Sequence, residues 1–242
     1  MFGFVRMSLP AALVNGGNLK ENAKGQQIYG NPSVLRKCVA DKKFAYVVAL
    51  ARAVNALNSA HSLMISTTGR DTPAALRDRM NSYFFVSAIL YESLKLIETM
   101  SPVYGKDKSF QTSLQLLLKD KTAQALKRMH LKAVRRDAVF HYLPDRFAEA
   151  IAKTPMTECV FASILGQQKG SIHYAFADYI AAEMMVGTRI DDAVVVNDMM
   201  EKTLALVKQF IDHSENFIAD QLNGWGFEVF PASPAAPGNQ SH

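Results

Sequence analysis

The stretch TPAALRDRMNSYFFVSAILYESLKLIET, residues 72–99, decides the fold class of this chain. It opens on Thr72, whose hydroxyl can accept a hydrogen bond from a free N–H at a helix start, and Pro73 follows at the first helical position. Gly69 ends the segment before it, and neither glycine nor proline interrupts residues 74–99. The stretch therefore predicts one long helix running to about Thr99.

The rest of the chain also has helical spacing of its apolar residues, with little to indicate a sheet. Further helices are predicted over 33–66, as one helix or as two joined near Asp41, and over 109–119, 121–142, 144–153, 156–165, 171–187 and 196–222. The expected domains are an irregular N-terminal lead-in (1–32), a single helical domain (33–229) and a disordered tail (230–242). The fold class is all-α, a helical bundle.

Composition fits a folded protein that does not span a membrane. The 242 residues are 49% hydrophobic, which is enough for a core, but no apolar run is long enough to cross a bilayer. The two cysteines, Cys38 and Cys159, provide neither a disulfide framework nor a CxxC metal pair. We therefore expect a cytoplasmic protein.

The net charge of +5 is concentrated in one region. Residues 119–153 hold nine Lys and Arg against four Asp and Glu, which equals the whole formal excess of the chain. Such a basic patch favours an anionic partner, such as nucleic acid or phosphate. The alternative is a solvated helix face with no partner.

Familiar cofactor and metal motifs are missing. The sequence contains no GxGxxG, no GxxxxGK[ST], no HExxH and no ExxH, and its six histidines never lie three or four residues apart. Asp191 and Asp192 are adjacent acids, for which a solvated loop is the better interpretation. We expect neither a metal nor a cofactor.

The stretch RRDAVFHY, residues 135–142, ends the basic helix. On a continuous α-helix Asp137 and His141 share a face, so Asp137 can orient the imidazole, while Phe140 can fix the rotation of the helix. A histidine between protonation states beside Arg136 suits RNA cleavage, which needs a proton-transfer group and a fixed cation on the phosphate. The simpler alternative is a solvated Arg136 and a half-buried or capping His141.

The segment RDAVFH resembles the R-x4-6-H motif of the HEPN superfamily, in which a polar residue follows the arginine. The surrounding KAVRRDAVFHYLPDRFAEAIAK (132–153) is similar to its "R-N-x-x-x-F-H" variants. More weakly, RDRMNSYFFVSAILYESLKLIE (77–98) resembles the long bundle helix that often carries an acidic residue facing the motif.

This resemblance implies an HEPN-like bundle with additional C-terminal helices, acting as a homodimer whose two motifs face each other. Many such proteins are metal-independent endoribonucleases of toxin–antitoxin or phage defence. Arg136 and His141 would be catalytic and Asp137 would support them. Glu92 is able to pair with Arg136, and the alternative is a solvated helix acid. The remaining cations of the helix are predicted to bind RNA: Lys127, Arg128, Lys132 and Arg135.

Two departures from the family pattern limit these expectations. Asp137 adds an anion near the substrate phosphate, and Tyr142 directly follows His141, so the H-x-Y ending of toxins paired with nucleotidyltransferase antitoxins is missing. Three hypotheses remain: a dimeric ribonuclease with a possible antitoxin or regulatory partner, a non-catalytic HEPN-like module that binds RNA, nucleotide or a protein, and a helical structural protein.

Overall fold

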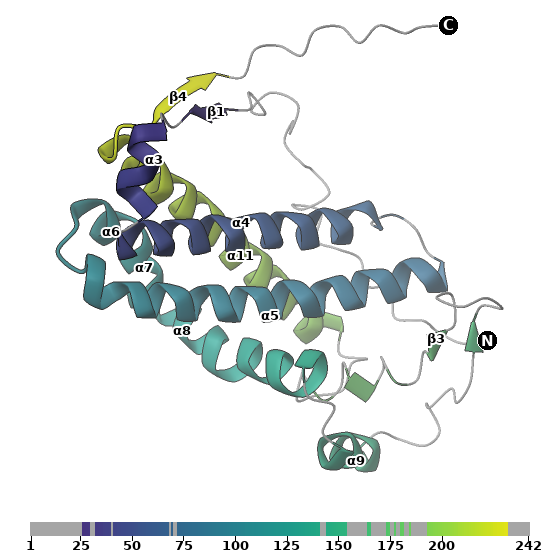
Figure 1. The fold of residues 1–242 in the computed structure, drawn as a ribbon. Helices are drawn as coiled ribbons and strands as arrows, with labels where there is room; N and C mark the ends of the chain where they lie inside the picture. Colours follow the sequence, from purple (N-terminus) through teal and green to yellow (C-terminus); the bar gives the residue numbers. More distant parts are fainter. Residues whose placement is uncertain are drawn as a thin grey trace, which may run out of the picture.

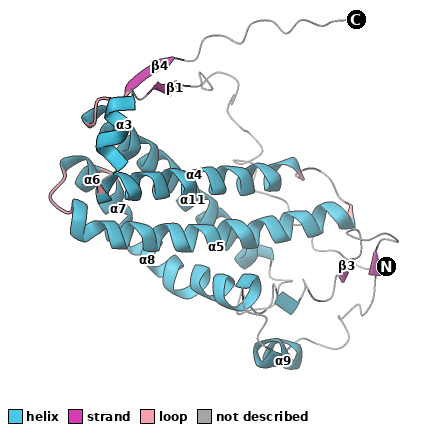
Figure 2. Cartoon of the chain, in the orientation of Figure 1, coloured by secondary structure: helices cyan, strands magenta, loops and turns pink. Residues whose placement is uncertain are grey.

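The computed structural model describes residues 26–29, 32–39, 41–67, 69, 72–140, 144–153, 164–165, 173–174, 177, 180–181, 184 and 193–231. Helices dominate this part of the chain, and the fold is all-α, as the sequence predicts (Figures 1 and 2). Among these residues, no helix combines the length and the apolarity needed to cross a bilayer.

Three long helices form the centre of the bundle: the first two run side by side, and the third crosses behind them obliquely (Figure 1). They are α4 (Lys42–Ser66), α5 (Pro73–Tyr104) and α11 (Ala193–Gly224). Their facing sides supply fully buried apolar side chains, including Leu50, Leu57, Leu90, Leu94, Ile97, Phe210 and Phe217. Burial of these side chains is the main stabilising contribution to the fold.

The helix starts agree with the capping residues of the sequence. Thr72 accepts a hydrogen bond from the N–H of Ala75 at 3.2 Å, and Pro73 opens α5 as predicted. Residues 33–66 form two helices, α3 (Pro32–Val39) and α4, because Asp41 caps the second through the N–H of Lys43. The prediction that α5 ends near Thr99 is short by about one turn. Pro102 lies within its last turn, and the helix ends two residues later.

A chain of short helices leads from α5 to the candidate motif. The segment predicted as one helix over 109–119 is two, α6 (Lys108–Thr112) and α7 (Leu114–Lys119), broken at Ser113. The next is helical without interruption from Lys121 to Phe140. It begins as α8 (Lys121–Leu126) and continues with two π-wound stretches, η1 (Lys127–Leu131) and η2 (Val134–Phe140).

Four short strands differ from the sequence prediction. In the predicted lead-in, β1 (Gln26–Tyr29) pairs antiparallel with β4 (Glu228–Pro231). The strand β4 therefore includes the first two residues of the predicted tail, which was expected to begin at residue 230. The strands β2 (Ile164–Leu165) and β3 (His173–Tyr174) also pair, at positions expected to be helical. The spacing of apolar residues along the sequence does not reveal backbone pairing between segments that are distant in sequence. The rest of the predicted lead-in up to residue 25, the predicted helical residues 156–163 and the tail from residue 232 lie outside the described residues.

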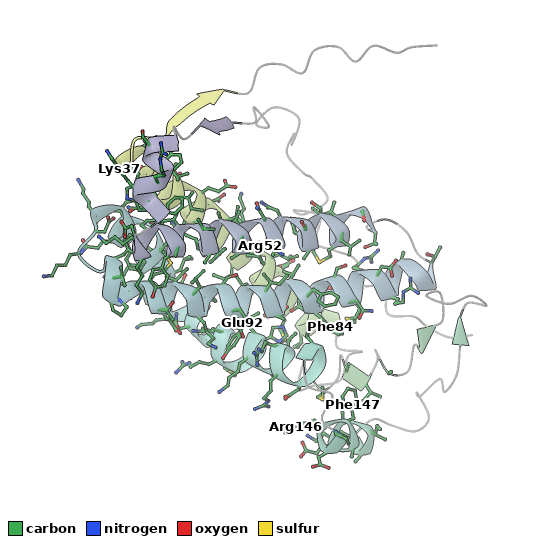
Figure 3. All side chains as sticks on the ribbon, viewed as in Figure 1. Lys37, Arg52, Phe84, Glu92, Arg146 and Phe147 are labelled. Atoms are coloured by element: carbon green, nitrogen blue, oxygen red, sulfur yellow. The ribbon has the colours of Figure 1, made fainter. Side chains whose placement is uncertain are left out.

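The helix after the motif is confirmed. The predicted segment 144–153 is α9 (Pro144–Lys153), whose Phe147 packs against the core and whose Arg146 pairs with Glu149 at 2.9 Å (Figure 3). The last predicted helix, 196–222, is also confirmed as part of α11, which is longer by three residues at its start and two at its end.

Candidate functional site

The helix from Lys121 to Phe140 positions the motif. Asp120 caps it by accepting hydrogen bonds from the N–H groups of Thr122 and Ala123 at 2.7 and 3.1 Å. Leu131 and Val134 are fully buried and fix its inner face against the bundle. Arg128 and Lys132 lie on the exposed side of the helix.

The π-winding changes which residues share a face. A π-turn closes hydrogen bonds between residues five apart, whereas an α-turn closes them between residues four apart. A π-turn therefore holds more residues, and side chains four or five apart come closer to a single line. π-Segments are uncommon and occur often at functional sites. The sequence gives no signal for this winding, because its apolar spacing also fits an α-helix.

The structure holds Arg136 against Asp137. Nε of Arg136 donates to Oδ1 of Asp137, and Nη2 donates to Oδ2 at 2.7 Å. The Asp137 side chain is 6% exposed, whereas that of Arg136 is 41% exposed. The hydrogen bonds and the charge of Asp137 raise the pKa of Arg136. The guanidinium is therefore charged and is held in one orientation by Asp137. Its other edge is open to solvent.

This geometry revises one expected role and leaves another as a prediction. Asp137 was predicted to orient His141; both of its carboxylate oxygens accept hydrogen bonds from Arg136, and the predicted contact with His141 lies outside the described residues. Glu92 was predicted to pair with Arg136, but it pairs with Nε of Arg135 at 2.8 Å. Figure 3 labels Glu92 on the side of α5 that faces this helix. The change of partner for Glu92 arises from side-chain directions, which sequence spacing alone does not determine.

The position of His141 lies outside the described residues. Phe140, the residue before it, is the last residue of η2. The structure therefore presents the arginine of the motif with its partner, and the role of the histidine stays a prediction.

The four predicted RNA-binding cations fall into two groups. Arg128 and Lys132 are exposed, and no carboxylate of the described chain forms an ion pair with either. The other two pair with acids of α5: Arg135 pairs with Glu92, while Lys127 is buried, pairs with Glu98 and lies 5.8 Å from the ring centre of Tyr91. Lys127 is therefore a packing contact between two helices, and its predicted contact with RNA does not fit this geometry.

A buried polar cluster joins the same helix to α5 and α11. The hydroxyl of Tyr83 lies 2.6 Å from Nε2 of His130 and 3.3 Å from Oγ1 of Thr203, which in turn donates to the carbonyl of Met199 at 2.8 Å. Sequence analysis missed this cluster because its members lie far apart along the chain. It fixes the position of η1 relative to both neighbouring helices.

This cluster predicts a distinctive response to alkaline pH. Burial is the largest cause that raises the pKa of Tyr83 to about 12. The folded state therefore favours the neutral phenol, and this stabilisation is complete below pH about 10 and is lost as the pH rises to about 12, a difference of roughly 3 kcal/mol. For Tyr83→Phe we expect about 1–2 kcal/mol lower stability at pH 7 but a smaller difference, or a reversed one, at pH 11.5. Urea unfolding at both pH values measures this.

Tyr91→Phe is the matched control for this experiment, because no hydrogen bond joins its hydroxyl to the described residues. It should leave stability nearly unchanged at both pH values. A Tyr83→Phe deficit that stays constant between pH 7 and 11.5 would contradict the assigned role of the buried phenol.

The described residues contain no group of three or more His, Cys, Asp or Glu side chains placed to hold a metal ion. The chain matches no known protein family, no curated protein and no solved structure. The similarity to the HEPN superfamily therefore rests on the residues of the motif and their setting on a basic helix.

Proposed function

We propose that this chain is a metal-independent endoribonuclease of the HEPN type, cleaving RNA by attack of a 2′-hydroxyl on the adjacent phosphodiester. The observation that supports it best is the presentation of Arg136, which rests on a buried carboxylate and keeps its second edge open. A preorganised cation of this kind stabilises charge that develops on a phosphate. The planar fork of arginine suits two phosphate oxygens.

The proposed reaction needs two proton transfers. The 2′-oxygen forms a bond to phosphorus while the bond from phosphorus to the 5′-oxygen breaks, which leaves a 2′,3′-cyclic phosphate and a 5′-hydroxyl. A base accepts the proton of the 2′-hydroxyl and an acid protonates the leaving oxygen. In a homodimer the two copies of His141 would fill these roles, and the two copies of Arg136 would bind the phosphate.

The resemblance also supports a biological setting. A ribonuclease of this type would act as a toxin or in phage or stress defence, in the cytoplasm, and a cognate antitoxin or regulatory protein would restrain it. RNA is then the substrate, and a second copy of the chain completes the site.

A non-catalytic module that binds RNA, nucleotide or a protein is the second candidate. The observation that favours it is the neutralisation of Arg135 by Glu92 and of Lys127 by Glu98, which lowers the effective charge of the helix. Asp137 likewise offsets Arg136. This candidate predicts RNA binding without cleavage, and binding that survives replacement of His141.

Expression in a bacterial host tests the proposal. Wild-type protein should arrest growth and fragment cellular RNA, and His141→Ala should remove both effects, since loss of a proton-transfer group lowers cleavage about 100- to 10,000-fold. His213→Ala, a half-buried histidine of α11, is the control and should remain toxic. Intact RNA in cells expressing soluble wild-type protein, or unchanged fragmentation with His141→Ala, would overturn the assignment.

A further inference from the structure

Three cations of the motif helix lie four residues apart. Arg128 and Lys132 are exposed, and Arg136 is half-exposed with its open edge outward. In an α-helix each step of four residues drifts by about 40° around the axis, because a turn holds 3.6 residues. Residues 127–131 and 134–140 are π-wound, whereas 132 and 133 are α-wound. A π-turn holds more than four residues, so a step of four falls short of a full turn there, and the two windings offset each other's drift. The three side chains therefore form one row along the helix.

The other two cations of this segment point elsewhere. Lys127, whose side chain is 9% exposed, is held by Glu98, and Arg135 is held by Glu92. Both acids belong to α5, so these pairs anchor the motif helix to the bundle. The helix thus has an anchoring side, with Lys127 and Arg135, and an open row, with Arg128, Lys132 and Arg136. The linear sequence intermixes the two groups.

We propose that Arg128, Lys132 and Arg136 form a track for three consecutive phosphates of one unpaired RNA strand, to which Lys127 and Arg135 contribute nothing. This rests on the proposed function, since it takes Arg136 as the cation at the scissile phosphate. Lys132 and Arg128 then bind the next two phosphates on the same side.

The single row of cations favours a single strand. Successive cations are four residues apart, a rise of about 6 Å in an α-helix and less where the helix is π-wound. One line of charges follows one backbone, whereas a duplex presents two. Phosphate contacts of this kind position the strand without reading its sequence.

The salt dependence of RNA binding measures the number of phosphate contacts. Uncleavable 2′-O-methyl RNA, unstructured and about twelve nucleotides long, serves as the probe so that binding is measured apart from cleavage. Each phosphate contact to a single strand contributes about −0.7 to the slope of log K against log salt, which is roughly fivefold in affinity at 0.1 M salt. One row should give a slope of about −2, and a strand that also follows the row of the second copy adds those contacts to it. Lys132→Gln and Arg128→Gln should each reduce the slope by about 0.7 and weaken binding about fivefold for each row that the strand follows.

Two controls separate the row from general charge effects. Arg135→Gln removes a cation of the same helix that pairs with Glu92, and Lys208→Gln removes an exposed cation of α11. Neither should change the slope. Equal losses for Arg135→Gln and Lys132→Gln, an unchanged slope for Lys132→Gln, or tighter binding of a duplex of the same sequence would each overturn the track.

The outcome is separable from that of the nuclease proposal. If unmodified RNA stays intact while the slopes change as expected, the nuclease fails and the track stands. If RNA is cleaved while Lys132→Gln and Arg128→Gln bind like the wild type, the track fails and the nuclease stands.

Discussion

Arg136→Lys is expected to lower RNA cleavage about 100-fold without unfolding the protein. Lysine keeps the positive charge above the buried Asp137, so the carboxylate is not left without a counter-charge. It lacks the planar guanidinium, however, which donates to Asp137 with one edge and would donate to the phosphate with the other. Removal of one preorganised donor to a developing charge typically lowers kcat by 100- to 1,000-fold.

The measurement for this variant is the single-turnover rate on a labelled RNA, with thermal unfolding to confirm the fold. Arg135→Lys is the matched control, because that arginine pairs with Glu92 and is not assigned to the reacting phosphate. We expect the cleavage rate of Arg135→Lys to stay within about threefold of the wild-type rate, because Arg135 makes no contact with the reacting phosphate in the proposed mechanism. A rate for Arg136→Lys equal to that of Arg135→Lys would remove Arg136 from the reaction.

Phe217→Ala is expected to cost about 3–5 kcal/mol of unfolding free energy. The Phe217 ring is fully buried and packs edge-on against Tyr104 and Phe110, with ring centres 5.1 and 5.9 Å apart. Truncation removes these contacts and leaves a cavity at the end of the bundle where α5, α6 and α11 meet. The loss is a large fraction of the 5–15 kcal/mol that stabilises a typical domain.

Urea unfolding of wild type and variant measures this difference. Phe85→Ala provides the control of equal size, because its side chain on α5 is 51% exposed. That variant should lose less than about 1 kcal/mol. A loss for Phe217→Ala as small as that of Phe85→Ala would show that the three aromatic rings are not a central part of the core.

Local signals in the sequence predicted the helices well. Thr72 with Pro73 identified the start of α5, and Asp41 marked the junction of α3 and α4. These signals act within a few residues of each helix end, so they can be read from a single sequence. Strand pairing between Gln26–Tyr29 and Glu228–Pro231 depends on segments about 200 residues apart and left no such signal.

The candidate site was predicted by residue type but not by partner. Charge and spacing identified Arg136 and Asp137, while the bidentate contact between them depends on rotamers. Spacing also could not separate Lys127, which faces α5, from Arg128, which faces solvent. The π-winding also left no signal in the sequence, because the apolar spacing fits an α-helix as well.

The most direct test of the central claim is incubation of the purified protein with a labelled mixed-sequence RNA in EDTA, beside its 2′-O-methyl counterpart, with product ends determined by mass spectrometry. The account predicts fragments that end in 2′,3′-cyclic phosphate from the unmodified RNA alone. RNA that stays intact in the presence of folded dimer, or cleavage of the 2′-O-methyl strand, would contradict it.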